Sequence, residues 1–136
     1  VYRQDATGAG TVNFIEGQND PNRQIIYTGA GSTELYMNAG SGVASGLNIS
    51  TGDWNVVVAK FDGASSYLRL NGTQSAALSA GTKVFDGICL GAYHGNSNHL
   101  NGAFAEVIVY GPTNQPSDAD IEAYFDSYYG AGWPKT

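Results

Sequence analysis

The sequence predicts an all-β, antiparallel fold of the sandwich or barrel type, closed by one short C-terminal helix. Glycine and asparagine recur about every eight to twelve residues, a spacing typical of all-β sandwiches and barrels rather than of alternating strand–helix units. The short runs between them are rich in β-branched and aromatic residues. Helical periodicity is found in one segment near the C-terminus. We expect residues 1–136 to form a single domain.

Strand-like segments follow one another along the chain. Residues 55–61 are an apolar run with three valines, which is too β-branched for a helix. In residues 66–71, Leu68 and Leu70 alternate with polar positions, and an Asp-Gly turn joins the two runs, so together they predict a hairpin. The other predicted strands are residues 1–3, 11–16, 24–28, 33–38, 73–78, 87–92 and 103–110.

The segment with helical periodicity has a start signal and a stop signal. Ser117 is placed to cap the first turn, with Asp120 three residues later in the position that Glu or Gln usually takes in a capping box. Gly130 is placed to end the helix. The apolar residues fall on one stripe and predict that the helix lies on the sandwich: Ile121, Tyr124, Phe125 and Tyr128.

Charge and cysteine content exclude several classes of protein. The 136 residues carry six Lys and Arg against twelve Asp and Glu, a formal net charge of −6. The basic residues are scattered, so we expect no nucleic-acid partner. No apolar run approaches the roughly 20 residues of a membrane helix, so we expect no membrane insertion. Cys89 is alone, which excludes an intrachain disulfide, and we expect it to be buried in a strand.

The carboxylates show no catalytic pair. Glycoside hydrolysis needs two facing carboxyl groups, but the residues spaced two apart, Asp118, Asp120 and Glu122, fall in the first turn of the predicted helix, where they offset its dipole. Glu106 interrupts an apolar strand, and we expect it to be paired and structural. A Gly-x-Ser-x-Gly nucleophile motif is missing as well. We therefore expect a protein that is not an enzyme.

One predicted loop concentrates polar and aromatic side chains. It offers stacking and hydrogen-bonding groups to a sugar or another polar ligand, through Tyr93, His94, Asn96, Asn98 and His99. A zinc site would need further ligands that the neighbouring sequence does not supply, so no metal is predicted here. The alternative is an ordinary exposed polar loop.

A second polar cluster spans residues 16–22 and is rich in side-chain oxygens. Turn chemistry explains this composition adequately. Calcium binding is the alternative, although the spacing matches no EF-hand loop. We otherwise expect no cofactor.

Turn and strand motifs in the second half of the chain carry a family resemblance. They are Gly52-Asp53-Trp54 before the valine-rich strand, Phe61-Asp62-Gly63, and residues 66–72, 85–92 and 100–110. Together with the closing helix, this succession resembles the concanavalin A-like lectin/glucanase superfamily, in its laminin-G/pentraxin-like branch, over about residues 52–130. The resemblance implies an antiparallel two-sheet jelly roll that meets ligands at edge loops or on its concave sheet.

The chain departs from the family pattern in three places. Pro116 stands where these domains usually have a leucine, which puts the entry into the helix in doubt. The N-terminal strands of a full-length domain are expected to be missing, so that an open edge would be filled by a partner chain or by sequence outside this fragment. The Glu-x-Asp-x-x-Glu strand motif of the glucanases is absent, so the resemblance does not imply their activity.

Two functions remain open from the sequence. The first is a non-catalytic carbohydrate- or surface-recognition module of an extracellular, cell-surface or virion-surface protein, with a glycan or polysaccharide as partner. The second is a structural decoration or assembly module, such as a phage capsid, tail or surface-layer component, that contacts only neighbouring protein subunits. The predicted ligand-binding residues for the first function are Tyr67, Arg69, Tyr93, His94, Asn96, Asn98 and His99.

Overall fold

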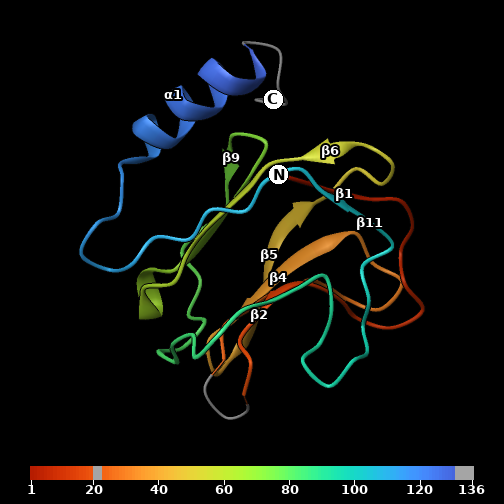
Figure 1. Cartoon of the computed structure of the whole chain (residues 1–136). Coiled ribbons are helices and arrows are strands. Elements are labelled where there is room, and N and C mark those ends of the chain that lie inside the picture. The colour runs from red at the N-terminus through yellow and green to blue at the C-terminus, as the bar shows by residue number, and fades with distance from the viewer. Residues whose placement is uncertain (20–22, 131–136) are drawn as a thin grey trace.

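Two layers of antiparallel strands face each other across one apolar core, with a helix outside one layer (Figure 1). The computed structural model describes residues 1–19 and 23–130. Its strands are β1 (Tyr2–Gln4), β2 (Val12–Glu16), β3 (Ile25–Thr28), β4 (Glu34–Asn38), β5 (Gly42–Asn48), β6 (Trp54–Asn55), β7 (Val57–Lys60), β8 (Tyr67–Leu70), β9 (Thr73–Gln74), β10 (Cys89–Leu90) and β11 (Gly102–Phe104). A 3-10 turn, Gly63–Ser65, precedes β8, and the helix α1 is Asp118–Tyr129.

The back layer is a five-stranded sheet in the order β10-β2-β3-β4-β5. Side chains alternate across it, so that Ile26 and the Met37 opposite it in β4 both face the core. The buried residues that this layer contributes to the core are Val12, Phe14, Ile26, Leu35 and Met37.

The front layer consists of two short ladders, β11-β1-β6 and β7-β8-β9. Val56 alone separates β6 from β7, so the two ladders lie end to end along the same stretch of chain. Tyr2, Leu68 and Leu70 supply the core face of this layer. Gly102 in β11 approaches β1 so closely that a Cβ there would lie 1.8 Å from the carbonyl oxygen of Arg3. The antiparallel two-sheet fold predicted from the sequence is therefore confirmed.

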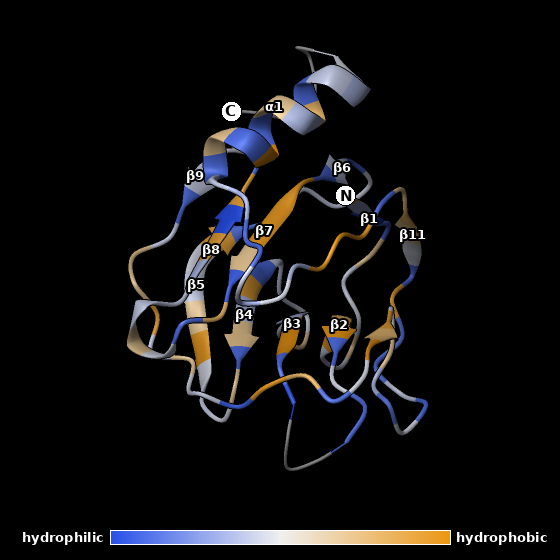
Figure 2. Ribbon diagram, turned by 60° about the vertical axis from the view of Figure 1, so that its left-hand side comes forward, coloured by the Kyte–Doolittle hydropathy of each residue, from blue (hydrophilic) through white to orange (hydrophobic). Residues whose placement is uncertain are grey.

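The helix begins and ends where its signals predict. The Ser117 hydroxyl accepts a hydrogen bond from the Asp120 amide (3.2 Å), and the Asp120 carboxylate accepts one from the Ser117 amide (3.1 Å), so the capping box is complete despite Pro116. Gly130 follows the last turn with φ of +77°. On the apolar stripe, Phe125 packs on Val56 of the front layer. The hydropathy colouring in Figure 2 shows α1 set against the layer that contains the apolar strand β7.

The last strands are shorter than the sequence predicts. Residues 87–92 contain only β10, and residues 103–110 contain only part of β11. The amides of Ala105 and Glu106 both donate to the Val1 carbonyl (3.0 and 3.3 Å), and beyond them the segment has no neighbouring strand in the described chain. Cys89 is half-buried rather than buried, because β10 lies at the edge of its sheet.

Glu106 is paired, as predicted. It accepts hydrogen bonds from the hydroxyls of Tyr124 (2.5 Å) and Tyr129 (3.0 Å), so it ties the segment after β11 to the helix. The hydrogen bond to Glu106, assisted by desolvation and nearby charge, raises the pKa of Tyr124 to about 12.

Replacing Tyr124 by Phe should therefore lower stability in a pH-dependent way. The folded-state pKa of this phenol lies above its unfolded value, so its stabilising effect is present in full below pH 10 and is lost as the pH rises towards 12. We expect Tyr124→Phe to lower the denaturation midpoint at pH 8, and the gap to the parent chain to narrow by pH 11.

Tyr128→Phe is the matched control, since Tyr128 lies on the same helix and is 72% exposed. A constant gap between Tyr124→Phe and the parent across this pH range would contradict the assignment.

Candidate functional site

The outer face of the five-stranded sheet carries polar and aromatic side chains instead of a second core. The strand registers place Asn13, Tyr27 and Tyr36 in one row across β2, β3 and β4, and Glu16 and Asn38 in the next. A register shift between Asn13 and Ile15 explains why Asn13 and Glu16, three residues apart, share a face. We call these five residues the outer-face residues.

Glu16 is the centre of this surface. Its side chain is fully buried, and its carboxylate accepts from the Arg23 guanidinium at 2.7 Å and lies 3.2 Å from Nδ1 of His94. The Asn13 amide nitrogen donates to the other carboxylate oxygen. Since an isolated buried carboxylate would be strongly destabilising, these partners account for its place in the fold.

The loop of residues 93–99 is anchored beside these strands. Its turn is closed by the amide of Tyr93 donating to the carbonyl of Ser97 (2.7 Å), and Asn96 and Asn98 adopt left-handed φ values of 62° and 54°. The backbone amide of Asn13 donates to the backbone carbonyl of Asn98 (3.1 Å). The Arg23 guanidinium lies 5.4 Å from the centre of the Tyr93 ring.

A small open pocket of about 230 Å³ lies between the sheet and this loop. Tyr27 stacks on Tyr36 with ring centres 5.2 Å apart, which forms an aromatic floor beside the pocket. Burial and then the neighbouring Tyr36 raise the pKa of Tyr27, so its hydroxyl stays protonated at neutral pH and can donate as well as accept. The pocket is lined by Thr11, Asn13, Arg23, Ile25, Tyr27, Asn38, Tyr93 and Asn98.

Three of the residues predicted from the loop meet at this surface. Tyr93 and Asn98 line the pocket, and His94 reaches Glu16. Asn96 and His99 are exposed and contact each other, with the His99 Nε2 3.2 Å from the side-chain oxygen Oδ1 of Asn96. Their side chains contribute to the loop and are not among those that line the pocket.

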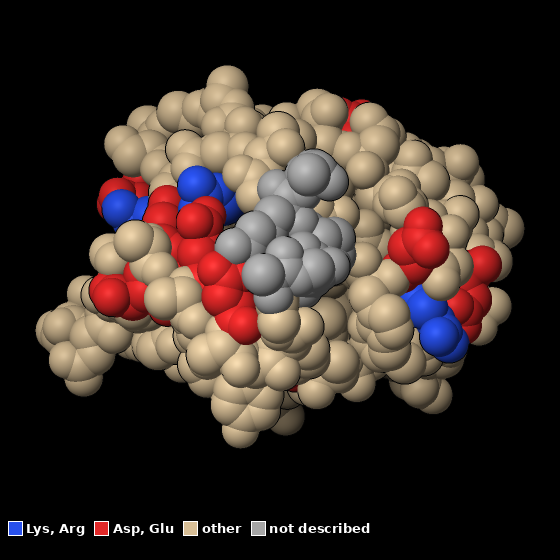
Figure 3. Space-filling view, turned by 90° about the horizontal axis from the view of Figure 1, so that it is seen from above, with Lys and Arg blue, Asp and Glu red and all other residues tan. Residues whose placement is uncertain are grey.

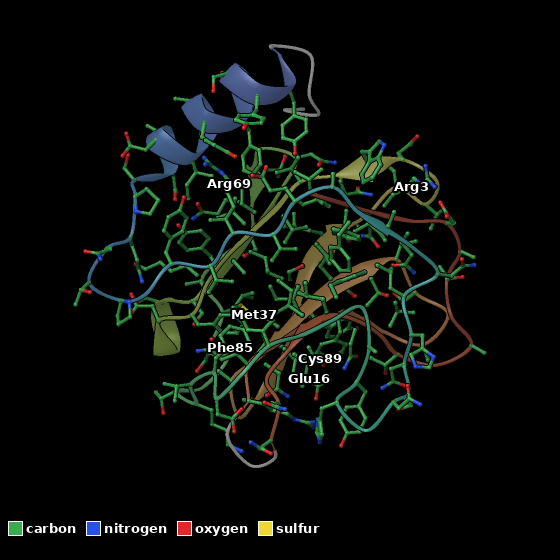
Figure 4. All side chains as sticks on the ribbon, in the orientation of Figure 1. Arg3, Glu16, Met37, Arg69, Phe85 and Cys89 are labelled. Carbon is green, nitrogen blue, oxygen red and sulfur yellow. The ribbon has the colours of Figure 1, made fainter. Side chains whose placement is uncertain are left out.

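Tyr67 and Arg69 lie elsewhere: the structure does not bring them to this surface, and their part in ligand binding stays a prediction. The alternation of β8 buries Leu68 and Leu70, so its other two side chains face α1. The Tyr67 hydroxyl donates to Asp118 (2.8 Å), and Arg69 pairs with Glu122 (2.6 Å). Figure 4 shows Arg69 beneath α1 and Glu16 at the other end of the molecule.

Most of the side chains that the sheet contributes to the candidate site were not predicted from the sequence. Asn13 and Glu16 interrupt an otherwise apolar strand, and Tyr36 and Asn38 occupy alternate positions in β4. These patterns mark a face turned away from the core. Arg23 carried no comparable signal, because only the folded chain brings it to Glu16.

The described ranges contain no group of three His, Cys, Asp or Glu side chains placed to hold a metal ion. In the oxygen-rich stretch, Asp20, Pro21 and Asn22 lie outside the described residues, and the Glu16 carboxylate is engaged by Arg23. Calcium binding by this stretch stays a prediction.

The described Lys and Arg residues form no continuous basic region on the face seen from the helix side. Figure 3 shows the Lys and Arg atoms of this face next to Asp and Glu atoms, in two separate groups. In the part of the chain that the structure describes, no helix has the length and hydrophobicity needed to cross a bilayer.

Comparison with known families gives one match. A family model described as "Concanavalin A-like lectin/glucanases superfamily" matches residues 1–120. The matched region contains both sheets, the outer-face residues and the loop of residues 93–99, and it ends in the first turn of α1. Comparisons with curated proteins and with solved structures give no significant match.

Removing the buried charge should destabilise the domain. In Glu16→Gln, Arg23 loses its negatively charged partner, and the new side-chain amide replaces an oxygen that accepts from Asn13 or Arg23. We therefore expect the free energy of unfolding to fall by about 2–3 kcal/mol. Urea denaturation followed by circular dichroism measures it.

Asp5→Asn is the control, because the ion pair of Asp5 with Arg3 is equally short (2.7 Å) but both side chains are more than a third exposed. It should change stability by less than about 1 kcal/mol. Similar small effects of both substitutions would show that the Glu16 cluster does not hold the loop.

Proposed function

We propose that this chain, which belongs to the concanavalin A-like lectin/glucanases superfamily, is a non-catalytic recognition module that binds carbohydrate on the outer face of its five-stranded sheet. The observation that carries the proposal is the pocket between the outer-face residues and the loop of residues 93–99. This pocket combines aromatic rings, amides and a guanidinium whose geometry the fold fixes.

Each group at the pocket has a use in binding a sugar. Tyr27 and Tyr93 present rigid, amphipathic rings at a small cost in conformational entropy. The amides of Asn38 and Asn98 provide both donors and acceptors for hydroxyl groups. The charge of Arg23 is offset by Glu16, so the surface favours a neutral glycan over a strongly acidic one.

The carboxylates of this face support a non-catalytic role. Glu34 shares the face with Glu16. Asn38 lies in the same row as Glu16 but two strands away, and Glu34 lies four residues before Asn38 in β4. Standard strand spacing therefore puts the Cα atoms of Glu16 and Glu34 roughly 17 Å apart. Glycosidases hold their two carboxyl groups about 5–9.5 Å apart. Glu34 also accepts from the Tyr36 hydroxyl (3.3 Å) and the Gly46 amide (3.0 Å).

A glycan-binding module acts where polysaccharide is exposed. We therefore propose an extracellular, cell-surface or virion-surface location, with glycan or polysaccharide as the principal partner. The low charge density of the chain and its abundant polar turns are compatible with such a location.

A second candidate function is an assembly module that contacts only protein. It is favoured by exposed apolar side chains at Val84, Ile88, Leu90, Ile108 and Val109. An oligomer in solution that buries well over about 1,000 Å² per contact would favour assembly. A monomer that binds glycan would favour recognition.

The glycan proposal is tested with an array of neutral and acidic polysaccharides, followed by calorimetry on the best ligand. We expect neutral glycans to bind, and Tyr27→Ala to weaken binding at least tenfold because it removes the ring beside the pocket. Tyr27→Phe keeps the ring and isolates the contribution of the hydroxyl.

Tyr128→Ala is the matched control, since this exposed tyrosine lies on α1, away from the pocket. It should bind as the parent does. No binding to any polysaccharide at millimolar concentration, or an equal loss in both alanine variants, would contradict the proposal.

A further inference from the structure

The pocket on the outer face has a fixed wall at one end. Tyr93 forms part of this wall, and its ring packs on Gly95, where a Cβ would lie 2.6 Å from Cε1 of the ring. The centre of the His94 ring lies 4.1 Å from that of Tyr93, and the Arg23 guanidinium lies 5.4 Å from it. Because these contacts restrict the ring on several sides, we expect the wall to keep its position when a ligand enters.

The wall stands at the β2 side of the sheet. The backbone amide of Asn13 donates to the carbonyl of Asn98 (3.1 Å), and that of Gly91 donates to the carbonyl of Phe14 (2.9 Å), so the loop is fixed along the edge of β2. From this end, the outer face leads over β3 and β4 to β5 at the opposite end of the sheet (Figure 2). A ligand that meets the wall can therefore continue across the sheet towards β5.

The far end of this path has small side chains. Ala44 stands opposite Tyr36 and Gly42 opposite Asn38, so both β5 residues lie on the outer face, and both are exposed. A Cβ at Gly42 would lie 3.0 Å from the hydroxyl oxygen of Tyr27, so the missing side chain leaves room for this tyrosine to lean across β4. At these two positions nothing larger than a methyl group stands between the stacked tyrosines and the edge of the sheet.

The path from the wall to the edge has the length of a short oligosaccharide. Neighbouring strands lie about 4.8 Å apart, so β5 lies roughly 14 Å from β2. The pocket at the wall end, of about 230 Å³, is smaller than the roughly 300–1,000 Å³ of pockets that enclose drug-sized ligands, so it suits a single sugar ring. On its β4 side, the oxygen of the Asn38 side chain accepts from the Gly40 amide (2.7 Å), so the nitrogen is the group that can donate to a ligand.

We propose that this pocket recognises the end of a polysaccharide chain and not its interior, an inference that rests on the proposed function. The terminal sugar occupies the pocket, between Tyr93 and Tyr27. The sugars that follow lie over Tyr36, and the chain leaves the sheet over Ala44.

The wall excludes the interior of a chain for a steric reason. An internal sugar has a neighbour on each side, and on this path one of the two neighbours would overlap the Tyr93 ring or the backbone of the loop. Displacing the loop would break the contact of His94 with the buried Glu16 and the hydrogen bond between Asn13 and Asn98. Because breaking contacts of a buried charge is strongly unfavourable, a chain end fits where an internal segment does not.

The test compares the number of chain ends with the mass of sugar. The probe is the neutral polysaccharide that binds best on an array that includes dextran, mannan, galactan and xylan. It is immobilised, and soluble chains of the same polysaccharide compete for the protein, either intact or shortened by mild acid hydrolysis, which multiplies the ends per gram. We expect the inhibitory potency per gram to rise in proportion to the measured number of ends.

Two variants separate the wall from the rest of the pocket. Tyr93→Ala removes the ring that blocks the path, whereas Tyr27→Ala removes a ring that a terminal and an internal sugar would both contact. Both should weaken binding, but only Tyr93→Ala should bring the potency ratio of hydrolysed to intact chains closer to one. If Tyr93→Ala binds too weakly to measure, the ratio obtained with the parent chain still decides.

The failure of this inference and the failure of the proposed function give different results. Equal potency per gram of intact and hydrolysed chains overturns end recognition and leaves glycan binding in place. No binding to any polysaccharide of the array overturns the proposed function, and end recognition with it.

Discussion

Glu16 is fully buried, and its carboxylate binds Arg23 at 2.7 Å, approaches His94 and accepts from Asn13. These partners come from three parts of the chain: β2, the stretch before β3, and the loop of residues 93–99. Breaking a buried ion pair is strongly unfavourable, whereas an intact one fixes geometry, so this cluster determines where the loop sits. The position of Tyr93 and Asn98 over the sheet, and with it the pocket, depends on this cluster.

The two faces of the five-stranded sheet differ in polarity because side chains alternate along each strand. Leu35 and Met37 are fully buried and hold the layers together, while Tyr36 between them is turned to the outer face. The same alternation in β8 buries Leu68 and Leu70 and gives Arg69 to the helix. The candidate binding surface and the support of the helix therefore both follow from the alternation of side chains, in two different layers.

The front layer is less complete than the back layer, and this difference has physical consequences. In the described part of the chain, its two ladders meet only through Val56, and an apolar cavity lies beside β7. The helix compensates in part, because Phe125 packs on Val56 and Glu106 accepts from two tyrosines of α1. Among the described residues, one edge of β7 has no neighbouring strand, and this edge lies beside the apolar cavity.

The sequence by itself determined the features that rest on local periodicity and turn chemistry. The hairpin of β7 and β8, the strands β2 to β4 and the capping box of α1 follow from alternation, β-branched residues and the spacing of Ser117 and Asp120. It also identified a polar aromatic loop, of which Tyr93, His94 and Asn98 reach the candidate site. Only the tertiary structure decided that Arg23 meets Glu16, that Tyr67 and Arg69 hold a helix, and that residues 105–110 are not a strand. The physical reason is that these outcomes depend on neighbours distant in the chain: an ion pair needs its partner, and a strand needs another strand beside it.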